Sequence, residues 1–466
     1  MAPKFGTSGL RGLVVELTPE LISDYVSAFI LACPTGPRLF VGEDLRPSSQ
    51  RIAAVVIAAA RDAGLNVTYC GALPTPALAQ IAMSAGAAAV MVTGSHIPSD
   101  RNGLKFYLPT GEISKTDEAA ILAKLGHAPK AATRGTLQYY AEAGADYLAR
   151  YRTAFGNAAL SGLRLGLYEH SSVARDLLHY ILLALGAEVV RLARSDIFIP
   201  VDTEAVDPAT REQLSEWCAA YRLDAVLSTD GDADRPMLTD ATGRVIAGDV
   251  LGVLTSIALG AKVICTPVSS NSMVDMLPDF AAVTRTKIGS PFVIAAMEEA
   301  LAQDPSAKVV GFEANGGFLL GFAAEGPAGP LPALMTRDAV LPIVAPLVLA
   351  QAKGQVLAEL VAALPARATA SDRLTEIPTE ASATFLSHLS KDASARAEFL
   401  APFGQEQALD RADGLRMTLA DGNVLHLRPS GNAPEFRIYT EAETLDAAAN
   451  LLEQAMNTIR LKFRGL

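Results

Sequence analysis

Cysteine is scarce in this sequence of 466 residues. The four cysteines are Cys33, Cys70, Cys218 and Cys265, and no two of them form a CxxC pair. Such scattered thiols indicate neither a zinc site nor a disulfide framework. A reducing compartment is therefore expected, and a cytoplasmic location fits it best.

Positive charge and long apolar runs are also in short supply. Lysine and arginine number 39 against 50 acidic residues, giving a net charge of -11. This excess excludes a nucleic-acid binder that relies on a broad basic surface, although local arginines can still bind a small anion. The N-terminal MAPKFGTSGLRG has no apolar signal region, and the most apolar stretch, 339–352, is short and interrupted by prolines. We expect that stretch to form one buried helix or two, and we expect neither a membrane nor a nucleic-acid partner.

A repeated pattern is the main organisational feature. Hydrophobic residues make up 50% of the chain, and its length suggests three or four domains at roughly 150 residues each. Three times a short apolar strand ends in a polar loop, followed by a second strand, a turn and a helix; the loops surround Ser95, Asp230 and Glu313. In the first repeat, Thr116 or Asp117 is the expected cap of the helix. The pattern predicts three related α/β domains with mixed sheets.

The last quarter of the chain has a different pattern. It predicts a hairpin around Asp421-Gly422, a further strand and an amphipathic helix, which together form a smaller C-terminal α+β domain. The segment from Leu364 to Arg373 is polar and rich in small residues, so it is the expected hinge. The predicted domain boundaries are 1–150, 151–250, 251–368 and 369–466.

Ser95 lies in the first polar loop, VTGSHIPSDRNGLKF (92–106), directly after the apolar run AAAVMV. Ligands meet α/β folds at strand ends, so Ser95 is a candidate nucleophile or phosphate ligand. The alternative is that this Gly-Ser pair only forms a turn.

The second polar loop carries three aspartates, Asp230, Asp232 and Asp234, at alternating positions. Carboxylates at this spacing converge on one hard cation, and Mg²⁺ would keep open positions for phosphate oxygens. A solvated acidic turn is the alternative, although three unpaired carboxylates repel one another. An EF-hand does not fit, because Arg235 follows where that loop needs glycine. Arg235 can instead grip an oxyanion beside the metal.

Two further loops carry groups suited to a phosphosugar. Arg428-Pro-Ser430-Gly-Asn432, with Arg437 downstream, combines guanidinium groups, a hydroxyl, an amide and exposed backbone N–H groups, which suit a phosphate. A surface turn with incidental arginines is the alternative. Glu313 and Asn315, in a glycine-rich loop, suit sugar hydroxyls, and a simple glycine turn explains them equally well.

Five motifs in this order carry a family resemblance. FGTSGLRG, TGSHIPSDRNGLKF, DGDADR, GFEANGG and RPSGNAPEFRIYTEA, spread over nearly the whole chain, resemble the α-D-phosphohexomutase superfamily of phosphomannomutases and phosphoglucomutases. The resemblance implies three α/β domains with mixed sheets and a smaller C-terminal α+β domain, arranged around a central cleft. It also implies a phosphoserine enzyme that uses Mg²⁺ and a hexose 1,6-bisphosphate as primer and intermediate.

The resemblance also implies a role for each candidate residue. Ser95 would carry the phosphoryl group and, with Asp230, Asp232 and Asp234, bind the metal. Arg11, Lys105 and His96 match positions near the phosphoserine. The substrate-binding positions would be Arg235, Lys287, Glu313, Asn315, Arg428, Ser430, Asn432 and Arg437.

The sequence departs from the usual family pattern at three places. TGSHIP replaces TASHNP at the serine, EANGG replaces an acidic loop that ends in histidine, and Ser290 stands where several relatives have histidine. The last two changes affect which groups bind the sugar and which residue is the acid or base. Lys287 is a candidate for the second role.

The resemblance implies exchange of hexose 1-phosphate and hexose 6-phosphate, with mannose as the expected sugar and glucose or glucosamine as alternatives. A small phosphosugar is then the expected partner, and the oligomeric state stays open. A metal-dependent sugar phosphatase would also use serine and a metal, but GxSxG is absent. A non-catalytic sensor would be expected to have lost Ser95 or an aspartate.

Overall fold

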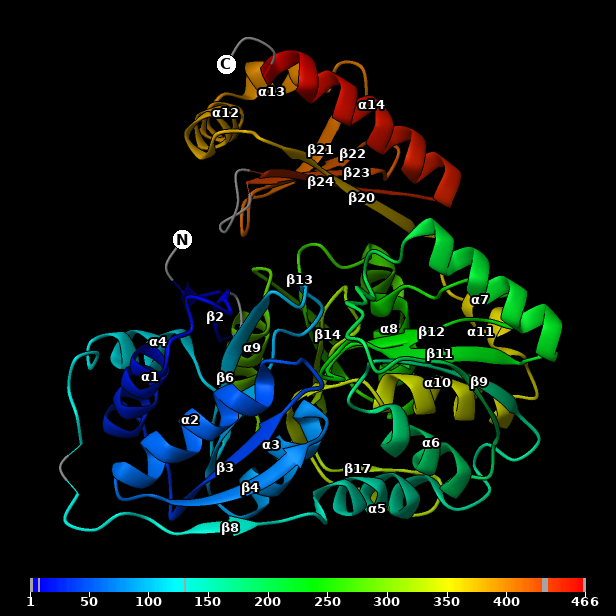
Figure 1. Cartoon of the computed structure of the whole chain (residues 1–466). Coiled ribbons are helices and arrows are strands. Elements are labelled where there is room, and N and C mark those ends of the chain that lie inside the picture. Colours follow the sequence, from blue (N-terminus) through cyan, green and yellow to red (C-terminus); the bar gives the residue numbers. More distant parts are fainter. Residues whose placement is uncertain (1–2, 7–8, 130, 430–434, 464–466) are drawn as a thin grey trace. The chain divides into compact units, whose positions relative to one another are not determined.

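The computed structural model describes residues 3–6, 9–129, 131–429 and 435–463 (Figure 1). The chain forms two compact units. Unit 1 comprises Met1–Ile264 and Gly289–Val361, and unit 2 comprises Cys265–Ile288 and Ala362–Leu466. The four predicted domain boundaries stay predictions. No helix within the described ranges is both long enough and apolar enough to cross a bilayer.

Unit 1 begins with a mixed sheet of strand order β1-β2-β6-β5-β3-β4-β8, with β7 paired to β6. Strands β3, β4, β5 and β8 pair in parallel, and the pairs involving β6 are antiparallel. Every residue of β5 is buried, as expected of a strand inside a covered sheet. The elements are β1 (Lys4–Phe5), β2 (Leu10–Leu13), α1 (Pro19–Ala32), β3 (Arg38–Glu43), α2 (Ser49–Asp62), β4 (Asn66–Ala72), α3 (Thr75–Ser84), β5 (Ala88–Val92), β6 (Arg101–Leu108), β7 (Gly111–Glu112), α4 (Lys115–Leu122) and β8 (Leu137–Tyr139).

A second mixed sheet in unit 1 has the order β10-β9-β11-β12. Strand β9 pairs in parallel with both β10 and β11, and β12 returns antiparallel to β11. Its elements are α5 (Ala143–Phe155), β9 (Arg164–His170), α6 (Arg175–Ala184), β10 (Glu188–Arg194), α7 (Pro208–Tyr221), β11 (Ala225–Thr229), β12 (Pro236–Leu238) and α8 (Gly248–Ala258).

The remaining strands of unit 1 include the antiparallel series β15-β16-β19. The apolar stretch 339–352 is confirmed as a buried helix, α10, which contains Pro346. The boundary between the units falls within β13 (Val263–Pro267). The further elements are α9 (Ser290–Gln303), β15 (Val309–Phe312), β16 (Phe318–Leu320), β17 (Ala324–Glu325), β18 (Pro330–Leu331), β19 (Leu334–Asp338), α10 (Leu341–Ala352) and α11 (Leu357–Ala362).

The predicted repeat is confirmed in all three places. A strand, a polar loop and an antiparallel return strand occur as β5–β6, β11–β12 and β15–β16. The three loops carry Ser95, the aspartates and Glu313. The fold class predicted for this part, α/β with mixed sheets, is therefore correct.

Unit 2 contains an antiparallel sheet of order β20-β24-β23-β22-β21. One sheet face packs on the helices through a core that includes Leu415, Leu427, Phe436 and Ile459. The predicted hairpin is confirmed, because β22 and β23 pair around Gly422, whose φ is 83°. The elements are η1 (Ser272–Met276), β14 (Ala282–Thr286), β20 (Ala368–Thr375), α12 (Thr379–Lys391), α13 (Ala393–Leu400), β21 (Glu406–Asp410), β22 (Leu415–Leu419), β23 (Val424–Pro429), β24 (Glu435–Ala442) and α14 (Leu445–Phe463).

One local prediction was wrong and another was wrong in part. The cap of α4 is Ser114, whose side chain accepts from Asp117 N, while the Asp117 carboxylate accepts from Ser114 N to complete a capping box. Asp117 is thus the third helical residue. The expected hinge, Leu364 to Arg373, is contradicted in its second part, since residues from Ala368 onward form strand β20 and pair with β24 at the edge of the sheet. Its first part, residues 364–367, stays a prediction.

Candidate active site

Ser95 lies in the loop between β5 and β6 and is 1% exposed. Its φ is 55°, a left-handed conformation that residues with a side chain rarely adopt. Its backbone N–H donates to Thr93 Oγ1 at 2.8 Å, and its Oγ donates to Asp230 Oδ2 at 2.5 Å. The predicted nucleophile and the predicted metal loop are therefore in direct contact.

Arg46 holds the serine loop in this shape. Its Nη2 donates to the carbonyls of Ser95 (2.7 Å) and Ile97 (2.5 Å), and its Nη1 donates to those of Pro98 (2.7 Å) and Arg101 (3.1 Å). The Phe198 ring centroid lies 4.1 Å from Arg46 Cζ. One buried guanidinium thus binds four carbonyls of a single loop.

Gly94 allows this close approach. A Cβ added at Gly94 would lie 2.7 Å from Arg46 Cζ. The guanidinium cannot easily move away, because Arg46 Nε is also fixed by Asp44 Oδ2 at 3.1 Å. Glycine in place of the alanine of TASH therefore leaves the space that the Arg46 guanidinium occupies.

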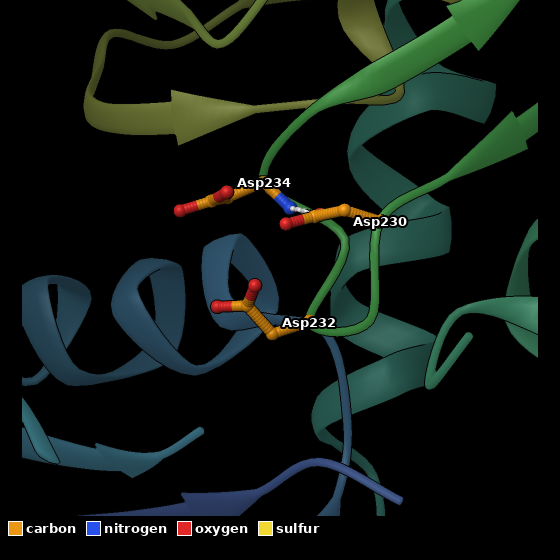
Figure 2. Close-up of side chains that lie close together, drawn as sticks. All are labelled: Asp230, Asp232 and Asp234. Atoms are coloured by element: carbon orange, nitrogen blue, oxygen red, sulfur yellow. Dashed lines mark hydrogen bonds between the residues drawn. The ribbon is translucent and has the colours of Figure 1, made fainter. Parts of the chain in front are cut away.

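The three aspartates lie in the turn between β11 and β12, and each is 0% exposed. One oxygen from each lies within 4.8 Å of the others. Figure 2 shows that the three carboxylates point to the same side of the loop, with Asp234 N donating to Asp230 Oδ1 at 3.2 Å. The predicted convergence of carboxylates is confirmed.

Two cations bind the Oδ2 atoms of Asp232 and Asp234. Lys105 Nζ, from β6, lies 2.5 Å from Oδ2 of both Asp232 and Asp234. Arg337 Nη2, from β19, lies 2.9 Å from Asp234 Oδ2. The other oxygens, Asp232 Oδ1 and Asp234 Oδ1, are buried without a hydrogen-bond partner, and Arg235 Nε lies 3.9 Å from Asp234 Oδ1. Unsatisfied buried carboxylate oxygens are costly, so these two atoms fit a metal ion as their missing partner.

The three carboxyl groups titrate differently. Burial, followed by repulsion from Asp232 and Asp234, raises the pKa of Asp230 well above its ordinary value. Burial also opposes ionisation of Asp232, yet Lys105 more than offsets it and lowers the pKa of that carboxyl. At Asp234, the same opposition from burial is overcome chiefly by Arg337, so its pKa is lowered too. Two carboxylates are thus held ionised by neighbouring cations.

Further cations surround the serine. Arg235 Nη1 donates to Nδ1 of His96 at 3.1 Å, and that nitrogen lies 3.4 Å from Ser95 Oγ. Burial, then Arg235 and Arg11, lowers the pKa of His96 to about 2. Burial also lowers the pKa of Arg11 to about 10. His96 is therefore neutral near pH 7 and accepts a hydrogen bond.

Glu313 and Asn315 lie in the loop between β15 and β16 and are 5% and 7% exposed. Glu313 Oε2 lies 3.7 Å from Arg337 Nη1. Asn315 Oδ1 accepts from Gly317 N at 3.0 Å. Burial raises the pKa of Glu313, although Arg337 and Arg235 act in the opposite direction. This loop faces the same guanidinium as the metal loop.

Ser290 starts α9 and donates to Glu112 Oε2 at 2.9 Å. Glu112 Oε1 accepts from Thr336 Oγ1 at 3.1 Å and from Arg337 Nε at 3.4 Å. The serine that replaces a histidine of several relatives therefore joins an ionic network in unit 1.

In unit 2, the Asp413 carboxylate binds both Arg428 and the backbone of the loop that contains Lys287. Arg428 and Arg437 are paired residues on β23 and β24. Arg428 Nε donates to Asp413 Oδ1 at 2.8 Å, and Asp413 Oδ2 accepts from Ile288 N, next to Lys287, at 3.0 Å. The predicted phosphate-binding residues Ser430 and Asn432 lie outside the described residues.

Unit 1 thus brings together most of the predicted site residues: Arg11, Ser95, His96, Lys105, Asp230, Asp232, Asp234, Arg235 and Glu313. The sequence prediction missed Arg46, Arg337 and Glu112. A signal was present for Arg337, because the charged pair Arg337-Asp338 interrupts an apolar run just before a buried helix.

The chain matches three family models. Residues 2–131 match "Phosphoglucomutase/phosphomannomutase, alpha/beta/alpha domain I", and residues 240–368 match alpha/beta/alpha domain III of the same family. Residues 357–458 match its C-terminal domain. Together these matches cover most of the chain.

Similar proteins cover nearly its full length. A phosphomannomutase of Sinorhizobium fredii is 46% identical, with 98% of each chain covered. A phosphomannomutase of Salmonella muenchen is 42% identical, covering 98% of this chain and 96% of the relative. A phosphoglucomutase/phosphomannomutase family protein of Burkholderia thailandensis has the same fold, with a TM-score of 0.78 at 20% identity and 98% of each chain covered.

Proposed function

Because the chain belongs to the phosphoglucomutase/phosphomannomutase family of α-D-phosphohexomutases, we propose that it interconverts mannose 1-phosphate and mannose 6-phosphate. The observation that carries this proposal is the contact of Ser95 Oγ with Asp230 inside the aspartate triad. A serine fixed beside a divalent-cation site is the arrangement that a phosphoserine mutase needs. The two full-length relatives named phosphomannomutase favour mannose as the sugar.

Mg²⁺ is the proposed cation. Asp230, Asp232 and Asp234 would hold it, together with an oxygen on Ser95. It would supply neutralisation of the charge that develops on the transferring phosphoryl group. Asp232 Oδ1 and Asp234 Oδ1, which are buried without a hydrogen-bond partner, support this assignment.

Phosphoserine 95 would donate its phosphoryl group to the 6-hydroxyl of a bound hexose 1-phosphate. The P–O bond to Ser95 breaks as the bond to the sugar oxygen forms, and the hydroxyl proton passes to a base on the protein. Arg11, Arg235 and Lys105 would supply the cations that stabilise this loose transfer. His96 accepts a hydrogen bond from Arg235 and orients that guanidinium.

The second transfer returns the 1-phosphoryl group of the hexose 1,6-bisphosphate to Ser95 and leaves hexose 6-phosphate. The bisphosphate must therefore reorient between the two transfers. Glu313 and Asn315 would bind sugar hydroxyls, and Arg428, Ser430, Asn432 and Arg437 would bind the phosphate that is not being transferred. Lys287 remains a candidate acid or base.

The four cysteines are free thiols. Free thiols are normal in a reducing compartment, and this supports the proposed cytoplasmic location.

A primed mutase assay tests the proposal. Wild type and Ser95→Ala would be incubated with Mg²⁺, a catalytic amount of hexose 1,6-bisphosphate and mannose, glucose or glucosamine 1-phosphate in turn. We expect wild type to form 6-phosphates, fastest from mannose 1-phosphate, and the variant to lose at least about 10³-fold in kcat, since its nucleophile is gone. Ser256→Ala is the matched control, because Ser256 is a buried serine bonded only to a helix carbonyl.

Release of inorganic phosphate without any 6-phosphate would contradict the mutase proposal and favour a phosphatase. Preferred conversion of glucose or glucosamine 1-phosphate would keep the mutase chemistry and change only the sugar.

A further inference from the structure

Arg337 is a buried cation that contacts three segments of the site. Its side chain is 3% exposed. Each nitrogen faces a different carboxylate: Nη2 lies 2.9 Å from Asp234, Nη1 lies 3.7 Å from Glu313, and Nε lies 3.4 Å from Glu112. Three segments therefore meet at one guanidinium: the loop of Asp230, Asp232 and Asp234 (the metal loop), the loop of Glu313 and Asn315 (the sugar loop), and β7.

The backbone on both sides of Arg337 is fixed. Thr336 donates to Glu112 at 3.1 Å. Asp338 accepts from Tyr147 (2.6 Å) and Tyr151 of α5, and it also accepts from Val340 N at the start of α10. The contacts of Thr336 and Asp338 thus restrict the movement of Arg337 near the end of β19.

The sugar loop packs directly on the Arg337 side chain. A Cβ added at Gly317 would lie 2.9 Å from Arg337 Cδ and 3.0 Å from its Cγ. The second glycine of EANGG is therefore needed for contact between this loop and the arginine stem. Any displacement of Arg337 would reach both Glu313 and Asp234.

We propose that Arg337 is a positioning residue that orients the metal loop and the sugar loop together, through Asp234 and Glu313. Its bond to Asp234 Oδ2 fixes the orientation of that carboxylate, whose Oδ1 lacks a hydrogen-bond partner and would bind the cation. Its proximity to Glu313 holds that carboxylate as an acceptor for a sugar hydroxyl. The inference rests on the proposed function and adds a residue for which the sequence motifs assign no role.

Only an arginine can serve all three carboxylates. The guanidinium is planar and presents its donors in a fixed fork, whereas a lysine ammonium is a single point charge. Arg337→Lys therefore keeps the positive charge, and with it the repulsion of Mg²⁺, while removing the fork. A change in ligand affinity in this variant reports orientation and not charge.

Two binding titrations test the proposal, both in a Ser95→Ala background in which no turnover occurs. Calorimetry would measure the Kd of Mg²⁺ without sugar and the Kd of mannose 1-phosphate without Mg²⁺. Arg337→Lys is expected to weaken both by about tenfold, the lower end of the effect seen when a residue that supports metal ligands is replaced. As references, Asp234→Asn should weaken mainly Mg²⁺, and Glu313→Gln should weaken mainly the sugar.

Arg396→Lys is the matched control. Arg396 is also buried and forks onto one carboxylate, with Nε 2.7 Å and Nη2 3.0 Å from the Glu406 oxygens, but it lies in unit 2 on α13. Its replacement should lower the melting temperature and leave both Kd values unchanged. A purely structural role for Arg337 would give the same result as this control.

A charge-balanced variant, Glu112→Gln with Arg337→Met, covers the case in which Arg337→Lys does not fold. It removes one positive and one negative charge, and replacing a buried ion pair by neutral side chains is often well tolerated. The same joint loss of affinity is expected. Weakening of only one ligand, or of neither, in the folded variant would overturn the proposal.

Failure of the proposed function would look different. Wild type would then form no 6-phosphate in the mutase assay, while the Mg²⁺ titration, which needs no turnover, would still decide whether Arg337 orients the metal loop.

Discussion

Ser95 Oγ donates a 2.5 Å hydrogen bond to Asp230 Oδ2, although the two residues are 135 positions apart in the sequence. Ser95 follows strand β5 and Asp230 follows strand β11, and these strands belong to different sheets of unit 1. Their contact joins the nucleophile to the metal loop, and it depends on the charge state of the aspartates.

Replacement of Asp230 by asparagine should separate metal binding from folding. Asp230 is repelled by the other two aspartates, so Asp230→Asn is expected to be at least as stable as wild type in EDTA. Wild type should gain about 2.7 kcal/mol at a Mg²⁺ concentration of one hundred times Kd. The variant should lose this gain. Thermal unfolding with and without Mg²⁺ measures both effects.

Asp240→Asn is the control for this experiment. Asp240 is also buried, but its Oδ1 accepts from Thr242 and Arg244 in a turn. It should keep the Mg²⁺-dependent gain. A full gain in Asp230→Asn would count against the aspartate site.

Lys105→Met should destabilise the protein most when no divalent cation is present. Lys105 neutralises Asp232 and Asp234, and loss of one partner in a buried ion pair costs about 3–5 kcal/mol. Mg²⁺ should restore part of this loss, because it neutralises the same oxygens. Chemical denaturation in EDTA and in Mg²⁺ gives the two values.

Lys115→Met provides the comparison. Lys115 forms a partly exposed pair with Glu118 at 2.6 Å, and such surface pairs contribute about 0–1 kcal/mol. Equal losses in the two lysine variants would disprove the special role of Lys105 beside the aspartates.

Arg46→Lys should lower kcat by about a hundredfold with little change in KM. A lysine cannot bind four carbonyls, so the left-handed Ser95 would relax and its Oγ would move away from Asp230. Added guanidinium should partly restore kcat in Arg46→Ala. Steady-state kinetics on phosphorylated enzyme would measure both.

Arg61→Ala serves as the control, since Arg61 Nε also donates to a carbonyl, Gly135 O at 2.9 Å, away from the site. It should keep kcat. If added guanidinium does not raise kcat in Arg46→Ala, the carbonyl contacts of Arg46 are not the cause of the loss.

His426 should make stability depend on pH. Burial lowers its pKa from 6.5 to about 4 in the folded state. The neutral form is therefore favoured by folding, and stability is present above pH 6.5 and lost as pH falls towards 4. A shift of this size corresponds to about 3 kcal/mol. Urea unfolding of wild type and His426→Gln between pH 4 and 7 measures the difference.

The glutamine can keep a donor near Asp413 O, which His426 Nε2 contacts at 2.7 Å. The stability difference between the two proteins should therefore shrink as the pH falls. Replacing the exposed His127 by glutamine should leave the loss of stability at acid pH unchanged. A parallel pH dependence in wild type and His426→Gln would contradict this assignment.

The sequence predicted the parts of the site that lie within single loops. The aspartates alternate in one turn, and Ser95 directly follows an apolar strand, so their placement follows from local pattern. Arg337 and Arg46 were missed because each acts on a loop that is distant in the sequence. No local spacing predicts that a guanidinium will cross to another loop.

The two errors in the fold have different causes. The cap of α4 moved to Ser114 because the capping box depends on reciprocal bonds with Asp117, and Thr116 competes on sequence alone. The polar stretch around Ser371 resembled a hinge, yet pairing with β24 makes it an edge strand. Reciprocal local bonds decided the first case, and tertiary strand pairing decided the second.

The buried ionic cluster of unit 1 has nearly balanced formal charges. It contains five acidic and four basic side chains: Glu112, Asp230, Asp232, Asp234, Glu313, Arg11, Lys105, Arg235 and Arg337. A phosphoryl group on Ser95 adds about two negative charges, and Mg²⁺ adds two positive ones. Gaining both leaves the formal charge of the cluster unchanged, whereas gaining one alone does not. Enzyme molecules that lose the phosphoryl group should therefore also release Mg²⁺ more readily. Phosphorylated and unphosphorylated molecules would then differ in bound metal as well as in the phosphoryl group.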